Sequence, residues 1–133
     1  MTSGFSWRKY LPTDYETVVP WFTARGWPEA PPEKFLPPTG IIIEDSEGPC
    51  CVGFLYLSNS PIGFLDWVST RPDLKRGGLK ALDFFFPVAK EAAKGIGVER
   101  VIHMALPKYA NVISKRYGFT EVEKLSLLVW GEG

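Results

Sequence analysis

Three short segments in the middle of the chain are rich in β-branched and aromatic residues, and a turn signal separates each from the next. They cover residues 41–43, 51–57 and 62–69, with turns at 45–49 and 58–61. Residues of these types favour strands, and short turns join neighbouring strands in antiparallel order. The pattern therefore predicts a three-stranded antiparallel meander, which limits the chain to folds built around a sheet.

Before this meander, the sequence alternates between a strand signal, a helix signal and a loop. Residues 5–10 predict a first strand, and residues 15–24 a short amphipathic helix with Thr13 or Asp14 as its N-cap. The proline-rich segment 26–38 reads as a loop that contains one short helix. The N-terminal third therefore adds a strand and a helix to the sheet.

After the meander, apolar residues recur at helical spacing. The stripe consists of Leu79, Leu82, Phe86, Ala89 and Ala93. This helix ends in a glycine signature at Gly95, and the remaining segments predict a strand at 100–106, a helix at 110–117 and a last strand at 125–130. The order predicts an α/β (α+β) domain over residues 1–133, with a mixed, mostly antiparallel central sheet and helices on both faces.

Charge and cysteine content exclude several classes of protein. The 133 residues include 15 lysines and arginines against 15 aspartates and glutamates, so the whole chain has no general attraction to nucleic acid or anionic membranes. The first ten residues lack the apolar core of a signal peptide, and no apolar stretch approaches the ~18 residues of a membrane span. The only cysteines, Cys50 and Cys51, are adjacent, which argues against a disulfide scaffold or a zinc site. We expect a cytoplasmic protein that does not associate with membranes.

Positive charge is concentrated before the long helix, in the sequence VSTRPDLKRGGLKAL of residues 68–82. Four cations and one anion between residues 71 and 80 give this segment a net charge of +3. Gly77 and Gly78 allow the backbone to approach an anion, and the N-terminus of a helix directs partial positive charge toward it. The segment predicts a phosphate site, with a solvated glycine turn as the alternative.

The same segment resembles the acyl-CoA-binding motif of the GNAT acetyltransferases, in which a valine-ended strand runs through a turn into a glycine-containing helix start. The sequence ANVISKRYGF at 110–119 is similar to the later helix of that family, which closes on Gly-Phe. The resemblance implies an N-acyltransferase that uses acetyl-CoA or another acyl-CoA as co-substrate and needs no metal. The implied cofactor-binding residues are Val68, Ser69, Lys75, Arg76, Gly77, Gly78, Leu79 and Lys80.

Several positions depart from the family pattern. Lys75 stands where the family has glutamine or arginine, Lys80 replaces a small residue, and Pro107 falls where an asparagine often contacts the pantetheine arm. Ser114 occupies the position at which the family often has a tyrosine that acts as general acid, and Tyr117 lies three residues further on. The resemblance therefore supports the fold more strongly than the chemistry.

Acyl transfer to an amine needs a base for the ammonium proton and an acid for the leaving thiolate. Asp66 is the candidate base, or a ligand of the acceptor ammonium, and two-residue alternation places it on the same side of its strand as Val68. Ser114 is favoured over Tyr117 as the acid by its distance from the glycine. His103, the only histidine, is expected to be a packing residue more often than a catalytic one.

The sequence leaves the acceptor open. Small amines, aminoglycosides, a protein lysine or N-terminus and an amine on a modified nucleobase all fit, and Trp27 is a candidate for selecting among them. A homodimer is also compatible with the sequence. Two alternatives remain at this point: a GNAT-like module that binds without catalysis, and an unrelated α/β domain in which the glycine pair is only a turn.

Overall fold

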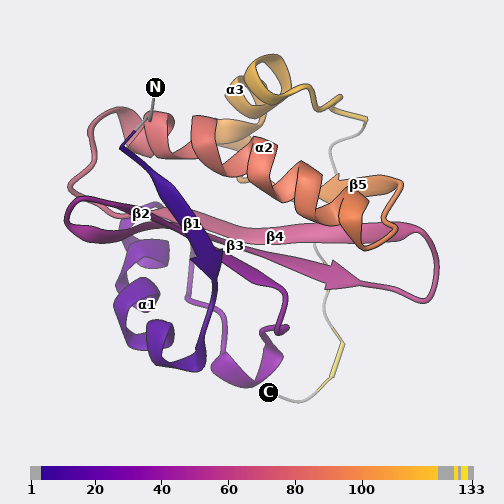
Figure 1. The fold of residues 1–133 in the computed structure, drawn as a ribbon, viewed down its shortest axis with the longest axis horizontal. Helices are drawn as coiled ribbons and strands as arrows, with labels where there is room; N and C mark the ends of the chain where they lie inside the picture. The colour runs from indigo at the N-terminus through magenta and orange to yellow at the C-terminus, as the bar shows by residue number, and fades with distance from the viewer. Residues whose placement is uncertain (1–3, 123–127, 129, 132–133) are drawn as a thin grey trace.

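The structure is a computed structural model, and it describes residues 4–122, 128, 130 and 131. Strands and helices follow one another along these residues in the predicted order (Figure 1). The elements are β1 (Ser6–Lys9), η1 (Pro12–Asp14), α1 (Tyr15–Ala24), η2 (Glu33–Phe35), β2 (Gly40–Asp45), β3 (Gly48–Leu57), β4 (Ile62–Thr70), η3 (Lys75–Gly78), α2 (Leu79–Gly95), β5 (Arg100–His103) and α3 (Pro107–Tyr117). The strand predicted at 125–130 lies largely outside the described residues.

The strands form one sheet in the order β1-β2-β3-β4-β5. The antiparallel meander of β2, β3 and β4 is confirmed, and β1 adds to it antiparallel to β2. β5 pairs with β4 in parallel, because α2 carries the chain back along the sheet before β5 begins. The sheet is therefore mixed and mostly antiparallel, as predicted.

Helices cover both faces of this sheet, with α1 on one face and α2 and α3 on the other (Figure 1). Phe85 and Phe86 of α2 are fully buried in the core on the α2 side, and Phe22 of α1 packs with Phe54 in the core on the α1 side. Gly53 makes the close approach of α2 feasible, since a Cβ there would lie 2.2 Å from the Phe85 ring. Burying each phenyl ring contributes roughly 1.5–3 kcal/mol. Among the described residues, no helix is long and apolar enough to cross a membrane.

A β-bulge interrupts the pairing of β3 with β4. Phe54 is opposite Asp66, but Val52 is opposite Ser69, so β4 has one residue more than β3 over this interval. Within the bulge, Trp67 has a φ of 53°, in the left-handed region that bulky residues rarely adopt. The bulge therefore lies in the strand that leads into the predicted cofactor segment.

The bulge also changes which face each side chain of β4 meets. Trp67 packs against the α1-side core, whereas Leu65 and Val68 pack against the α2-side core. Burial raises the pKa of Tyr56, another residue on the α1 side, and the neighbouring Asp66 carboxylate adds to that rise. The expectation that Asp66 and Val68 share a face was wrong, because the extra residue breaks the two-residue alternation.

The parallel strands β4 and β5 pair only from Ile62 opposite Arg100 to Leu65 opposite His103. At this last pair, the His103 Nδ1–H donates to the Leu65 carbonyl oxygen across 2.8 Å. The chain then leaves β5 for α3, whereas β4 continues. Residues 66–70 consequently have no strand partner on the β5 side within the described part of the chain.

Two predicted boundaries differ from the structure. Asp14 lies at the N-cap position of α1 but caps no amide there, because its carboxylate binds Arg8 at 2.7 and 2.8 Å and accepts the Leu11 N–H. Thr13 lies inside η1. The helix predicted at 110–117 begins at Pro107, since proline is well suited to the first turn of a helix, and β5 is correspondingly shorter than predicted.

Candidate functional site

The turn that connects β4 to α2 has a backbone conformation that few sequences adopt. Arg76, Gly77 and Gly78 have φ values of 55°, 67° and 78°, three successive residues in the left-handed region. The Thr70 hydroxyl donates to the Gly77 carbonyl oxygen at 2.7 Å, which fixes the turn against the end of β4. Gly78 is the N-cap of α2, with no side-chain cap on the free amides of that helix. Those amides and the turn can together bind an anion.

Three cations of this turn are exposed and available to such an anion. Lys75, Arg76 and Lys80 make no ion pair or side-chain hydrogen bond with any described residue. Arg71, by contrast, is bound by Asp45 at 2.8 Å and by Asp73 at 2.7 Å. The net charge of +3 predicted for the segment is therefore carried by its three free cations.

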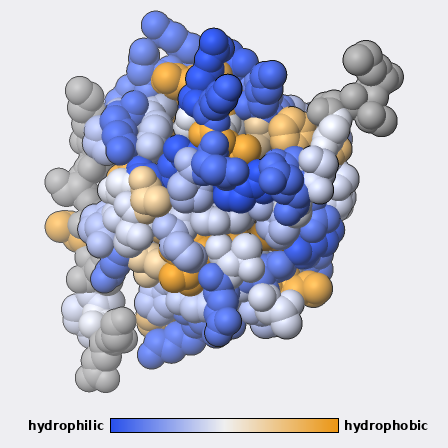
Figure 2. Space-filling model, turned by 90° about the vertical axis from the view of Figure 1, so that its left-hand side faces the viewer, coloured by the Kyte–Doolittle hydropathy of each residue, from blue (hydrophilic) through white to orange (hydrophobic). Residues whose placement is uncertain are grey.

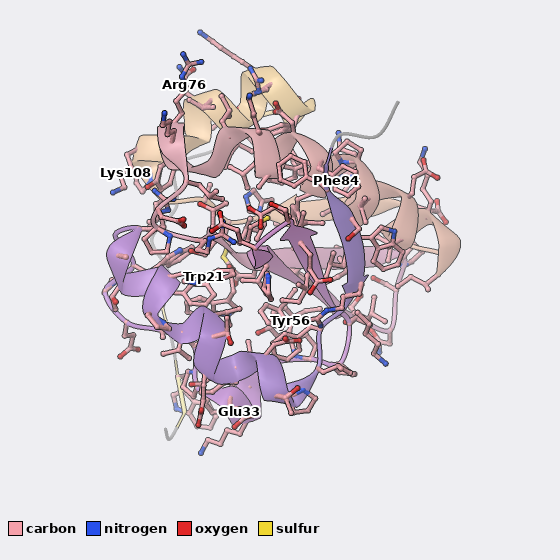
Figure 3. All side chains as sticks on the ribbon, turned by 60° about the vertical axis from the view of Figure 1, so that its left-hand side comes forward. Trp21, Glu33, Tyr56, Arg76, Phe84 and Lys108 are labelled. Carbon is pink, nitrogen blue, oxygen red and sulfur yellow. The ribbon has the colours of Figure 1, made fainter. Side chains whose placement is uncertain are left out.

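The surface around this turn suits a charged ligand. Arg76 and Lys108 lie at the same end of the molecule, and the Arg76 side chain points outward (Figure 3). The face of the protein on this side is mostly hydrophilic, and its hydrophobic residues form small separate groups (Figure 2). This arrangement can hold phosphate groups by backbone amides and exposed cations together.

The remaining predicted cofactor residues line the path from β4 to α2. Val68 and Leu79 are half-buried against the α2-side core, and Leu79 is the first residue of α2. Ser69 is buried, and its hydroxyl has no hydrogen-bond partner among the described residues. Gly78 is also buried, and a Cβ on it would lie 2.5 Å from Thr70. Gly78 is thus required for packing against Thr70, whereas a Cβ on Gly77 would project into open space.

The candidate base, Asp66, lies at the point where β4 and β5 separate. It follows directly after Leu65, the last β4 residue paired with β5, and its Oδ1 accepts the Trp67 N–H at 2.8 Å. Burial raises the pKa of Asp66 above its usual range. A half-buried carboxylate with a raised pKa can accept a proton from an ammonium group more readily than an exposed one.

An aromatic wall stands beside this carboxylate on the α1 side. The rings of Trp27 and Trp67 are 5.1 Å apart at 44°, and the Tyr56 hydroxyl donates to the Phe35 carbonyl oxygen at 3.0 Å. The sequence singled out Trp27 alone, and the fold packs it against Trp67, the residue that follows Asp66. Figure 3 shows Tyr56 and Trp21 between the sheet and α1.

Both candidate acids already have hydrogen-bond partners. The Ser114 hydroxyl donates to the Ala110 carbonyl oxygen at 2.6 Å within α3. The Tyr117 hydroxyl donates to Asp83 at 2.9 Å, and its ring stacks on Phe86 with centroids 4.3 Å apart. Burial raises the pKa of Tyr117, and the Asp83 hydrogen bond raises it further. Ser114 needs only a rotation of its hydroxyl to donate elsewhere, whereas Tyr117 is held by its buried ring.

His103 has the surroundings of a packing residue. Its ring lies 5.6 Å from Phe86 and 5.5 Å from Phe119, and its Nε2 is buried without a partner among the described residues. Burial lowers the pKa of His103. The described residues contain no cluster of metal-ligating side chains, and burial raises the pKa of the free Cys50 thiol to about 11.

By sequence the chain matches no family model and none of the curated proteins. By structure it is similar to many acetyltransferases. An aminoglycoside acetyltransferase AAC(6')-Iy, in complex with a CoA bisubstrate analogue, superimposes with a TM-score of 0.69 at 14% identity, over 97% of this chain and 99% of that one. The chain has the GNAT fold.

Two other acetyltransferase structures are similar to this chain over nearly its whole length. A ribosomal-protein-alanine N-acetyltransferase from Brucella melitensis has a TM-score of 0.66 at 9% identity, covering 95% of this chain and 99% of its own. Glucosamine-6-phosphate N-acetyltransferase from Arabidopsis thaliana has a TM-score of 0.65 at 10% identity, covering 96% and 99%. The GNAT fold predicted from the two motifs is therefore confirmed across nearly the whole chain.

Sequence reasoning missed three parts of this GNAT-fold site. Thr70 fixes the glycine turn, Trp67 forms the bulge, and Arg25 reaches the segment before that turn from the end of α1. Thr70 could have been found from its position at the end of the strand before the glycines. Trp67 and Arg25 carry no local signal, because their roles depend on segments distant in sequence.

Proposed function

We propose that the protein is an N-acyltransferase that moves an acetyl or other acyl group from acyl-CoA to an amine. The observation that carries the proposal is the turn from Arg76 to Gly78, which joins a left-handed backbone, three free cations and the N-terminus of α2. CoA presents a pyrophosphate and a further phosphate, so it matches this combination of amides and positive charge. The GNAT fold and CoA-bound neighbours such as AAC(6')-Iy support the same cofactor.

In the proposed reaction, the neutral amine nitrogen attacks the thioester carbonyl carbon and the carbon–sulfur bond then breaks. Asp66 takes the proton that the acceptor must lose, directly or through water, and its raised pKa suits it to that role. As the amide forms, the attacking nitrogen loses a second proton, and Ser114 or water relays a proton to the CoA thiolate, so that the thiol leaves and the relaying group ends neutral. Tyr117 could supply that proton only if it left Asp83.

The class of amine that receives the acyl group is a separate question. The neighbours are named for an aminoglycoside, a sugar phosphate and a protein alanine, so the GNAT fold alone does not select among amines. The possible acceptors are therefore small amines, aminoglycosides, protein amines and an amine on a modified nucleobase. We place the reaction in the cytoplasm, because free thiols such as those of Cys50 and Cys51 stay reduced there. Trp27, which packs against Trp67 next to Asp66 in the chain, is the residue that we expect to discriminate among these amines.

The proposal is tested first by binding and then by turnover. Acetyl-CoA at about 100 times its dissociation constant should stabilise the protein by ~2.7 kcal/mol, measured by thermal shift and calorimetry. CoA release with a panel of amines should then be faster for the wild type than for Asp66→Asn, and the wild-type rate should fall as pH falls through the raised pKa of Asp66. A folded protein that millimolar acetyl-CoA does not stabilise would contradict the proposal.

A second candidate is a GNAT-fold module that binds acyl-CoA without transferring the acyl group. It is favoured by one observation: the hydroxyls of Ser114 and Tyr117 both donate to groups of the protein itself. Acetyl-CoA binding without CoA release for any amine in the panel would favour this module over the enzyme.

A further inference from the structure

Arg25 directly follows α1, yet its side chain ends at the cofactor turn. Its Nε donates to the Thr70 carbonyl oxygen at 3.2 Å, and its Nη2 donates to those of Arg71 at 2.7 Å and Leu74 at 3.4 Å. One guanidinium therefore donates to three backbone carbonyl oxygens of residues 70–74, the segment that leads from β4 toward η3. A planar group with several fixed donors can hold such a segment in one shape.

The charge of Arg25 is not neutralised by an acid. None of the ion pairs among the described residues includes it, and its three acceptors are carbonyl oxygens. The side chain of Lys108 adds a second cation nearby, since its Nζ lies 2.5 Å from where a Cβ on Gly26 would be. Positive charge thus reaches the segment before the turn from Arg25 at the end of α1, and Lys108 of α3 lies beside the next residue, Gly26.

Arg25 also joins the turn to the rest of the site. The Tyr109 hydroxyl, at the start of α3, donates to the Arg25 carbonyl oxygen at 3.0 Å. Trp27, in the aromatic wall, is two residues further along the chain. A single residue therefore connects α1, α3 and the turn that carries the free cations.

We propose that Arg25 is a positioning residue for the phosphates of acyl-CoA, which fixes residues 70–74 so that the turn at 76–78 keeps its left-handed shape. This inference rests on the proposed function and extends it to a residue outside the acyl-CoA motif. A ligand that has the acylated pantetheine arm but no phosphates should not depend on Arg25, because it does not reach the turn.

The test compares two ligands, acetyl-CoA and phosphate-free S-acetylpantetheine, by calorimetry on the full chain. Arg25→Met should weaken acetyl-CoA binding by about tenfold or more, since hydrogen bonds to a charged group are lost, and S-acetylpantetheine binding by less than about twofold. Arg25→Lys keeps the charge but not the planar set of donors. Its affinity for acetyl-CoA should lie between those of Arg25→Met and the wild type. Tyr109→Phe is the matched control, because it removes a bond of the same junction without touching the turn, and it should leave both affinities near wild type.

Each outcome decides between separate ideas. A wild type that does not bind acetyl-CoA overturns the proposed function, and this inference with it. If the wild type binds acetyl-CoA and Arg25→Met binds both ligands as tightly as the wild type does, the inference alone is overturned. Equal losses for both ligands would also overturn it, because they would indicate general damage to the fold. If Arg25→Met does not fold, the same two-ligand comparison on Arg25→Lys decides the matter.

Discussion

The turn at residues 76–78 and the acid–base candidates are proposed parts of one site, and they are built differently. The turn is defined by backbone conformation, with three left-handed residues, a helix N-terminus and side chains that are free. The acid–base candidates are side chains, and Ser114 and Tyr117 already donate within the protein. A backbone-defined site tolerates changes in side chains around it, whereas the chemistry depends on individual groups. We therefore expect substitutions in the two regions to affect different measurements.

The largest effect should come from adding one methyl group to the turn at Gly78. Gly78→Ala forces a side chain onto a residue with φ of 78° and places its Cβ 2.5 Å from Thr70, so we expect a loss of about 2–4 kcal/mol in the free energy of unfolding. The control is Gly77→Ala, whose Cβ meets open space and which should cost only about 1 kcal/mol. Urea denaturation of both variants makes the comparison, and equal losses would contradict the packing role of Gly78.

Gly77→Ala should in turn have the larger effect on acetyl-CoA, because its methyl group projects where the backbone is open to a ligand. From the sequence alone, both Gly77 and Gly78 were expected to let the backbone approach an anion. The structure assigns that open space to Gly77, since Gly78 faces Thr70.

The next effect is on turnover, and it distinguishes the Ser114 hydroxyl from the Tyr117 hydroxyl as the general acid. If Ser114 protonates the thiolate, Ser114→Ala should lower turnover by about 100-fold or more and leave the affinity for acetyl-CoA unchanged. Tyr117→Phe should leave turnover near wild type but lower stability by about 1 kcal/mol, because it removes the hydrogen bond to Asp83. Steady-state kinetics and denaturation on the two variants measure both quantities. The opposite pattern would assign the acid role to Tyr117.

A smaller effect is expected from the exposed cations. Lys75→Ala combined with Arg76→Ala should weaken acetyl-CoA binding by about 30-fold at low salt and flatten its dependence on salt. The control pair is Lys94→Ala with Arg100→Ala, two exposed cations in the last turn of α2 and at the start of β5. If both pairs weaken binding equally, the turn has no special role and only the overall charge matters.

The smallest effect should appear in the pH dependence of stability. His103 is buried with a lowered pKa, so the unfolded chain binds its proton more readily, and stability should fall as pH falls below ~6.5. Asp66 acts in the opposite direction, because its raised pKa favours protonation in the folded state. The measurement is therefore made in an Asp66→Asn background, where His103→Phe should flatten the slope between pH 5 and pH 7. An unchanged slope would show that His103 does not titrate on unfolding.

Much of the fold, and the glycine turn before α2, could be predicted, because their signals are local. The apolar stripe from Leu79 to Ala93 predicted the helix, and the two cations before Gly77 and Gly78 predicted the turn. The bulge at Trp67 could not be predicted, since it depends on the register between two strands.

The partners of the catalytic candidates could not be predicted either, for the same kind of reason. Tyr117 meets Asp83 only because α2 and α3 pack on the same face of the sheet. Arg25 reaches residues 70–74 only because α1 ends beside β4. Helix and glycine patterns describe a single segment, and these contacts join segments far apart in the chain.

The neighbouring indole rings of Trp27 and Trp67 also give the protein an optical signature. Two such rings with centroids 5.1 Å apart share their electronic excitation, and their 44° tilt makes the shared states chiral. The pair should therefore produce a split band in the ultraviolet circular dichroism spectrum that either Trp27→Phe or Trp67→Phe removes. Because the Trp67 backbone N–H donates to the Asp66 carboxylate, an amine bound to Asp66 should disturb this band, and acceptors could be screened without a label and without any turnover.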